Sequence, residues 1–129
     1  KFSNPLKNIY YSYITKSDPY SYESVEKLLK KFKNNINLIK GNSNHVLKEI
    51  NASKFDYVFL DGGHKYETVR DDLKCLTSVI KNKGTILCDD YNLTYAPGIK
   101  KAINEFIINN NFNLRILNDR FAEIREKSG

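Results

Sequence analysis

Four residues in this sequence combine side-chain types and spacing that suit metal or acid–base chemistry. Asp61 and His64 lie just after one apolar segment, and the adjacent pair Asp89 and Asp90 follows another. Carboxylate oxygens are preferred ligands of hard divalent cations such as Mg²⁺, Mn²⁺ and Ca²⁺, whereas zinc is more often held by histidine and cysteine. The three aspartates therefore predict a site for a hard cation. His64 is close enough in sequence to act there as a general base or an extra ligand.

Each of these residues also has a purely structural interpretation. An aspartate at a strand end often forms a turn or caps a helix, and Asp61 before two glycines or Asp90 before a loop would fit that role. A histidine that opens a helix can cap it or pair with a nearby carboxylate. Because Asp61, Asp89 and Asp90 are expected at neighbouring strand ends, we favour a functional group, which we name the aspartate cluster. For His64 both interpretations stay open.

Strand and helix patterns alternate along the chain and position these residues. Runs of aromatic, β-branched and other apolar residues predict strands at residues 9–15, 36–40, 55–60 and 85–88. The third strand is apolar on both faces and is expected near the centre of a sheet. Apolar residues at helical spacing predict helices from Ser21 to about Asn34, after Asn42 or Ser43, from Tyr66 to Ile80, and from Pro97 to Ile107. A hairpin is expected around Asn118 and Asp119.

This order predicts an α/β fold of Rossmann-like type, with a mostly parallel sheet, helices on both faces and a C-terminal antiparallel hairpin. We expect one domain over residues 1–129. Ligands bind at the carboxyl ends of the strands in such sheets, which directs attention to residues 41–43, 61–64 and 89–92. Strands joined by one crossover helix are usually neighbours, so the aspartate cluster should converge at one edge.

The composition limits the class of protein. The net charge of +6 comes mainly from lysines that form no long run, and the aromatic residues are not interleaved with arginine. Both observations argue against nucleic-acid binding. Cys75 and Cys88 lack metal or redox spacing, so we expect reduced thiols in the core. Because no apolar run is long enough for a membrane span, we expect a cytoplasmic protein without a membrane partner.

Residues 55–67 (FDYVFLDGGHKYE) and 84–91 (GTILCDDY) together resemble the class I S-adenosylmethionine-dependent methyltransferases. They are most similar to the metal-dependent O-methyltransferases of sugars and natural products, over about residues 36–108. The resemblance implies that Asp61, Asp89 and Asp90 hold magnesium. It also implies that S-adenosylmethionine contacts Asp61 and the loop formed by Gly41, Asn42 and Ser43. Asn42 stands where the family has aspartate, and it changes the charge and the donor pattern of that loop.

The activity that the resemblance implies is Mg²⁺-dependent O-methylation of a small hydroxylated substrate. The bound metal would lower the pKa of the substrate hydroxyl and direct it at the sulfonium methyl group. His64 or Asp61 would then accept the proton as the catalytic base.

The sequence departs from the family upstream, since it contains no G-x-G. The family places a glycine-rich loop after its first strand, so we expect a domain truncated at the N-terminus, in which residues 9–15 are the second strand. Asp18 is a weak match to the acidic residue that binds the ribose. The exposed sheet edge would pair with a second copy of the chain or be covered by residues 1–8.

Two other functions remain open. One is a truncated or degenerate domain that binds no cofactor and has a structural or oligomerising role, which the missing glycine loop supports. The other is a Mg²⁺-dependent hydrolase with an acidic cluster, although the sequence has neither an Asp-x-Asp motif nor a Walker loop. His45 is expected to be a surface residue.

Overall fold

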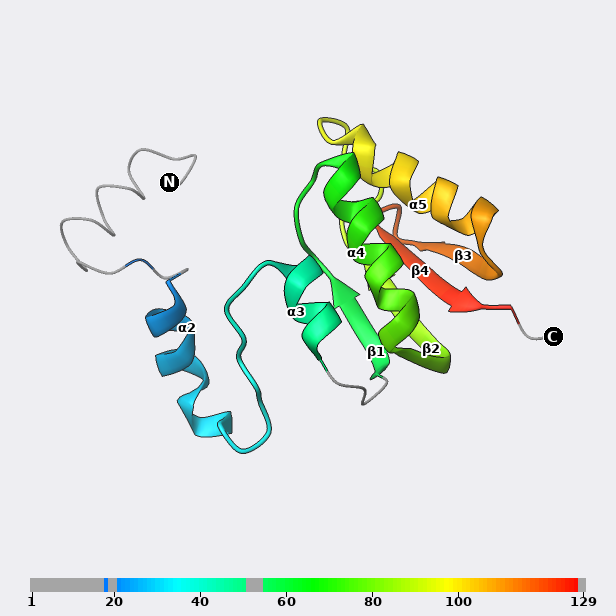
Figure 1. Cartoon of the computed structure of the whole chain (residues 1–129). Coiled ribbons are helices and arrows are strands. Elements are labelled where there is room, and N and C mark those ends of the chain that lie inside the picture. Colours follow the sequence, from blue (N-terminus) through cyan, green and yellow to red (C-terminus); the bar gives the residue numbers. More distant parts are fainter. Residues whose placement is uncertain (1–17, 19–20, 51–54, 128–129) are drawn as a thin grey trace. The chain divides into compact units, whose positions relative to one another are not determined.

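The computed structural model describes residue 18 and residues 21–50 and 55–127, and the chain divides into two compact units, residues 1–41 and 42–129 (Figure 1). The strand expected at residues 9–15 and the edge-covering segment at residues 1–8 lie outside the described residues.

The first unit contains the helix expected from Ser21. Helix α2 spans Tyr22–Leu29 and continues into a 3-10 turn, η2, at Lys30–Phe32. The Ser21 hydroxyl accepts a hydrogen bond from the Ser24 backbone N–H at 3.2 Å, which explains where the helix begins. The apolar stripe that was expected to be buried is not, because α2 has no buried residue and Leu28 is 75% exposed.

The strand expected at residues 36–40 is wrong, because this segment has no regular secondary structure. The segment is a short apolar run, but a strand also needs a neighbour for its backbone groups. The described residues supply none, and Ile39 is 49% exposed. Within the described residues, the Tyr22 hydroxyl donates a hydrogen bond to the Leu38 carbonyl of this segment at 3.4 Å.

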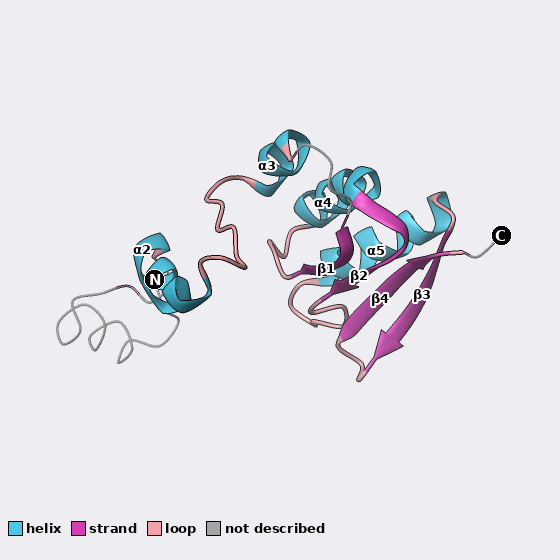
Figure 2. Ribbon diagram, turned by 90° about the horizontal axis from the view of Figure 1, so that it is seen from below, coloured by secondary structure: helices cyan, strands magenta, loops and turns pink. Residues whose placement is uncertain are grey.

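The second unit is built on a four-stranded sheet in the order β1-β2-β4-β3 (Figures 1 and 2). Its strands are β1 at Phe55–Leu60, β2 at Ile80–Cys88, β3 at Phe112–Leu117 and β4 at Phe121–Glu126. Strand β1 pairs with β2 in parallel, whereas β4 is antiparallel to both of its neighbours. The predicted C-terminal hairpin is confirmed, and its turn uses the positive φ angles of Asn118 and Asp119.

Strand β1 was expected near the centre of the sheet, but within the described residues it is the edge strand. Val58 and Leu60 face the core, while Tyr57 and Phe59 on the other face are 55% and 51% exposed. An apolar composition indicates that a strand can be buried on both faces, but it does not show which other strands pair with it.

Helices α4 (Tyr66–Val79) and α5 (Pro97–Asn109) pack side by side on one face of the sheet, and α3 (Ser43–Glu49) contacts α4 (Figure 2). All three helices were predicted. They enclose a core with β2 and β4, whose fully buried members include Leu73, Ile86, Ile103 and Ile124. No helix among the described residues is long and apolar enough to cross a membrane.

The break expected at residues 82–84 lies inside β2 rather than at the end of α4. The helix ends at Val79 and the strand begins at Ile80, with an irregular register opposite Phe55 and Tyr57. Lys83 adopts the left-handed conformation, with φ of 68°. A Cβ on Gly84 would lie 2.6 Å from Ile80 Cγ1, so this glycine is required by close packing and not by a helix cap.

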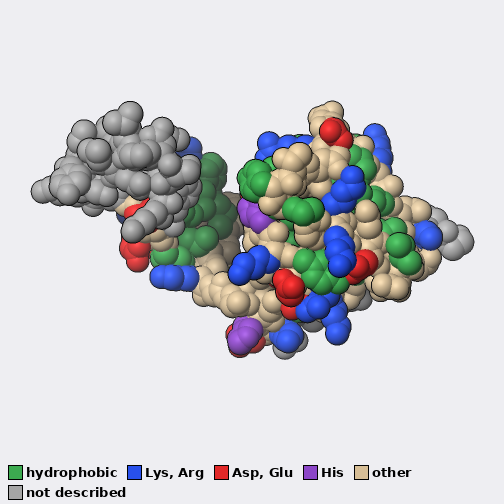
Figure 3. All heavy atoms as spheres, turned by 90° about the horizontal axis from the view of Figure 1, so that it is seen from above, with side chains coloured by type: hydrophobic (Ala, Val, Ile, Leu, Met, Phe, Trp, Pro, Cys, Tyr) green, Lys and Arg blue, Asp and Glu red, His purple; other side chains and the backbone are tan. Residues whose placement is uncertain are grey.

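Cys75 and Cys88 are free thiols, as expected. Burial raises the pKa of the Cys88 thiol to about 12, which makes it an unreactive core residue. On the face of the second unit shown in Figure 3, lysine and arginine side chains stand in several separate groups among neutral and acidic ones.

Candidate active site

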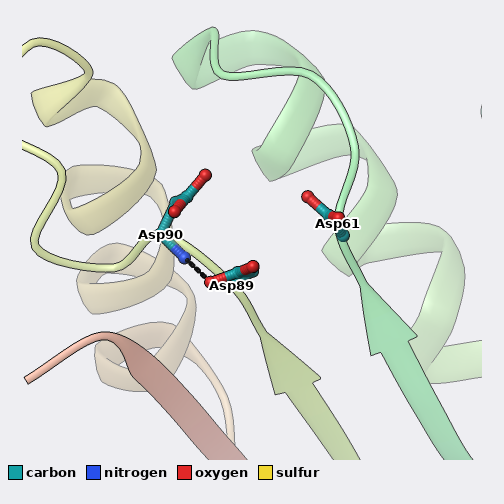
Figure 4. Close-up of side chains that lie close together, drawn as sticks. All are labelled: Asp61, Asp89 and Asp90. Carbon is teal, nitrogen blue, oxygen red and sulfur yellow. Dashed lines mark hydrogen bonds between the residues drawn. The ribbon is translucent and has the colours of Figure 1, made fainter. Parts of the chain in front are cut away.

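The parallel pairing of β1 and β2 brings the aspartate cluster together, as predicted. Leu60 is in register with Cys88, so the residues that follow them, Asp61 and Asp89, are neighbours. A hydrogen bond of 3.0 Å from the Asp89 N–H to the Leu60 carbonyl continues the pairing to the strand ends. One carboxylate oxygen each from Asp61, Asp89 and Asp90 lies within 4.8 Å of the others (Figure 4). The convergence is confirmed, while the role as metal ligands stays a prediction.

The backbone turns sharply at Asp90 and positions its side chain. Asp90 has φ of 60°, a left-handed conformation that aspartate tolerates better than most residues. The Asp90 N–H donates to Asp89 Oδ1 at 2.7 Å (Figure 4), and the Tyr91 N–H donates to the Arg120 carbonyl at 2.8 Å. These bonds fix the backbone of the segment that follows β2, and the fixed backbone positions the side chains of Asp89 and Asp90.

Arg120 holds Asp89 through a bidentate ion pair. Its Nε and Nη2 atoms donate to the two carboxylate oxygens of Asp89 at 2.6 Å each, and Nη2 is 3.9 Å from Asp90 Oδ1. Hydrogen bonds from Arg120 lower the pKa of Asp89, against the opposing effect of burial. Sequence reasoning missed this residue.

His64 lies at the edge of the aspartate cluster. Its Nε2 atom is 3.1 Å from Asp90 Oδ2, and its ring stacks on Tyr95 with 6.4 Å between centroids. The half-exposed imidazole therefore pairs with a nearby carboxylate, which is one of the two expected alternatives. This contact also orients the ring, so it does not exclude a role as base.

The cofactor loop expected at residues 41–43 divides between the two units, since Gly41 ends the first and Asn42 begins the second. The Asn42 side chain accepts a hydrogen bond from the Asn44 N–H at 3.0 Å and caps α3. The Ser43 hydroxyl donates to Asp72 Oδ1 at 2.6 Å. The side chains expected at the cofactor therefore already have structural partners.

Asp72 is the second residue that sequence reasoning missed. It is a carboxylate on α4 that is only 2% exposed, and Ser43 is 29 positions away in the sequence. A Cβ on Gly62 would lie 3.4 Å from Asp72 Oδ2, so Asp72 also lies against the loop that follows β1. One buried side chain thus contacts both the start of α3 and the glycine loop beside the cluster.

A cavity of about 20 Å³ lies among residues 60–64, Asp72, residues 88–90, Val69 and Ile99. This volume suits one water molecule or one ion. Pockets for drug-sized ligands measure about 300 Å³ or more, so this cavity is of ion size and not of cofactor size. His45 is exposed, as expected.

Comparison with known proteins identifies the family of this chain. A family model described as "Methyltransferase domain" matches residues 5–91, which is more than half of the chain. The chain therefore belongs to this methyltransferase family. No curated protein matches the sequence.

Solved structures agree on the fold. The O-methyltransferase NovP has a TM-score of 0.67 at 18% identity, over 84% of this chain and 46% of that one. The methyltransferase PaMTH1 of Podospora anserina, solved with SAH bound, has a TM-score of 0.66 at 21% identity, over 86% and 58%. CalS11, a TDP-rhamnose 3'-O-methyltransferase of calicheamicin biosynthesis, has a TM-score of 0.62 at 18% identity, over 84% and 53%.

These likenesses confirm the Rossmann-like α/β class that the sequence predicts. The chain spans about half the length of these solved methyltransferases.

Proposed function

We propose that this chain forms the metal-binding side of an S-adenosylmethionine-dependent O-methyltransferase that uses Mg²⁺ to methylate a small hydroxylated substrate. The observation that carries the proposal is the convergence of three carboxylates within 4.8 Å at two strand ends of a methyltransferase-family chain. Ligands of sheets of this type bind at such ends.

The aspartate cluster fits a hard divalent cation. All of its donors are carboxylate oxygens, and the adjoining cavity of about 20 Å³ is of ion size. Arg120 occupies both oxygens of Asp89 and would share or release them. A bound divalent cation supplies Lewis-acid chemistry, which lowers the pKa of a coordinated hydroxyl.

Asn42 and Ser43 fit an adenine-bearing cofactor only in part. The Asn42 side-chain oxygen is used by the helix cap, so its amide NH₂ group is what it can offer a ligand. Ser43 donates its proton to Asp72 and can still accept a hydrogen bond. S-adenosylmethionine supplies an activated methyl group when bound, and we propose that these two residues contact its adenine.

The proton of the acceptor hydroxyl would pass to His64 or Asp61. With the proton on Nε2, His64 donates to Asp90 and presents Nδ1 as the basic nitrogen. Asp90 then orients the ring, and its other oxygen, Oδ1, lies 3.9 Å from Arg120 Nη2. Asp61 is exposed at the end of β1 and is the alternative base.

A domain without cofactor binding is the competing function. The absence of G-x-G from the 129 residues favours it, as do the hydrogen bonds that already occupy the Asn42 and Ser43 side chains. The edge position of β1 within the described sheet would suit pairing with a second copy of the chain.

Calorimetric titration of the protein with S-adenosylmethionine, in the presence and absence of Mg²⁺, separates these functions. The proposal predicts saturable cofactor binding and a separate Mg²⁺ isotherm that disappears in the Asp89→Asn/Asp90→Asn variant. Mg²⁺ binding without cofactor binding would favour the hydrolase. A flat response to both ligands would favour the domain that binds no cofactor.

A further inference from the structure

The Arg120 guanidinium is a positive charge that binds directly to the aspartate cluster through Asp89. Arg120 follows the two left-handed residues of the β3–β4 turn, and its carbonyl accepts the Tyr91 N–H at 2.8 Å. This backbone bond ties the hairpin to the segment after β2. The guanidinium then reaches Asp89 with two contacts of 2.6 Å, which is the fork geometry that arginine forms with carboxylates.

The two sides of this ion pair differ in mobility. Asp89 is 8% exposed, and backbone hydrogen bonds hold it on either side. The Arg120 side chain is 58% exposed and reaches the cluster from the surface on a long flexible stem. Its guanidinium carbon lies 5.1 Å from the centroid of the Phe121 ring, so an aromatic face lies beside it if it leaves Asp89. The carboxylate is therefore the fixed partner and the guanidinium the movable one.

We infer that Arg120 is an exchangeable counter-ion of the aspartate cluster, which holds Asp89 until a divalent cation displaces it. The inference rests on the metal site proposed above. A cation that coordinates Asp89 needs a carboxylate oxygen, and both oxygens carry a hydrogen bond from Arg120. The positive charge of Arg120 also opposes the approach of a second cation.

Arg120 reduces the charge repulsion within the aspartate cluster. Asp61, Asp89 and Asp90 carry three formal negative charges, and like charges at short range repel one another. Arg120 offsets part of this charge in the metal-free protein. It thereby sets the metal affinity below the value that the carboxylates alone would give.

Titration calorimetry with Mn²⁺ alone tests the inference. Arg120→Gln is expected to bind Mn²⁺ about fivefold more tightly than the wild type, which is the scale of an ion pair with one solvent-exposed partner. Arg115→Gln is the matched control, because it removes the same charge from an exposed position on β3. Arg115→Gln should bind Mn²⁺ as the wild type does. Arg120→Lys, which keeps the charge but loses the fork, should lie between wild type and Arg120→Gln.

The outcomes also separate this inference from the proposed metal site. Equal or weaker Mn²⁺ binding by Arg120→Gln, with binding by the wild type intact, overturns the exchange and leaves the metal site standing. Equal tightening by Arg115→Gln overturns it too, since only net charge would then matter. If neither the wild type nor Arg120→Gln binds Mn²⁺, the metal site fails and the exchange fails with it.

A second measurement uses the wild-type protein and needs no variant to fold. The sequence contains four arginines, so the Nε–H resonance of Arg120 can be assigned by NMR. Addition of Mg²⁺ should shift this resonance and speed its exchange with water as the contact to Asp89 is lost. An Arg120 resonance that stays unchanged while Asp61 and Asp90 respond to Mg²⁺ would overturn the exchange.

Discussion

The aspartate cluster and the Ser43–Asp72 contact both lie beside the glycine loop that follows β1, but they are held in different ways. Backbone bonds at two paired strand ends hold the cluster, whose partner Arg120 has a 58% exposed side chain. The Ser43–Asp72 contact is one hydrogen bond of 2.6 Å to a carboxylate that is 2% exposed. The cluster is thus arranged for an exchangeable charge, whereas Asp72 forms a fixed internal contact that positions a loop.

Substitution of His64 tests the chemistry on the cluster side. His64→Gln should lower the rate of methyl transfer about 100-fold if His64 is the base, because positioned proton acceptors contribute at least about that factor. His45→Gln is the control, since His45 is exposed on α3. A rate within twofold of the wild type for His64→Gln would assign the proton to Asp61 instead.

Removal of the Asp72 carboxylate tests the Ser43–Asp72 contact. Asp72→Ala should lower the free energy of unfolding by about 2 kcal/mol, because it removes the buried carboxylate that accepts the hydrogen bond of the Ser43 hydroxyl. Asp71→Ala, at the neighbouring and more exposed position, should change it by less than about 0.5 kcal/mol. Denaturation in urea measures both. Equal effects of the two variants would show that the Ser43–Asp72 contact contributes nothing specific.

Close packing around Gly84 shapes β2, the strand that leads to Asp89 and Asp90. Gly84→Ala should destabilise the fold by about 1–2 kcal/mol, because its Cβ would meet Ile80 Cγ1 at 2.6 Å and the Lys81 carbonyl at 2.8 Å. Gly62→Ala meets its nearest atom at 3.4 Å and should be nearly neutral. Thermal melts compare the two variants, and a Gly84→Ala melting temperature equal to that of the wild type would contradict the packing account.

The ion pair between Arg120 and Asp89 predicts a direction of pH dependence. The pKa of Asp89 is lowered from 3.8, so the pair stabilises the fold above that value and the contribution is lost as the pH falls through the folded pKa. Urea denaturation from pH 6 to pH 2 should show a steeper loss of stability in the wild type than in Arg120→Gln. Parallel curves would show that the pair contributes nothing measurable.

Much of this organisation could be predicted from local pattern. Strand β1, helices α3 to α5, the β3–β4 hairpin and the convergence of the cluster followed from periodicity and from the adjacency of strands joined by one helix. The start of β2 was missed because Ile80 continues the helical spacing of α4. Residues 36–40 carry a strand pattern, but a strand also requires a neighbour that the pattern cannot supply.

Arg120 and Asp72 differ in whether the sequence alone could have pointed to them. Arg120 is 31 positions from Asp89, and only the folded hairpin brings them together. Asp72 left a signal, because it lies three residues after Val69 and four before Leu76 on the buried stripe of α4. A polar residue on an apolar helical stripe predicts a buried partner, although it does not name Ser43.

The most direct measurement of the proposed function is transfer of an isotopically labelled methyl group from S-adenosylmethionine to a sugar acceptor, with and without Mg²⁺. The account predicts Mg²⁺-stimulated transfer by the wild type, its complete loss in Asp89→Asn/Asp90→Asn, and its retention in Asp56→Asn/Asp71→Asn, which removes the same charge from surface ion pairs. Mg²⁺-stimulated transfer that survives in Asp89→Asn/Asp90→Asn would contradict it.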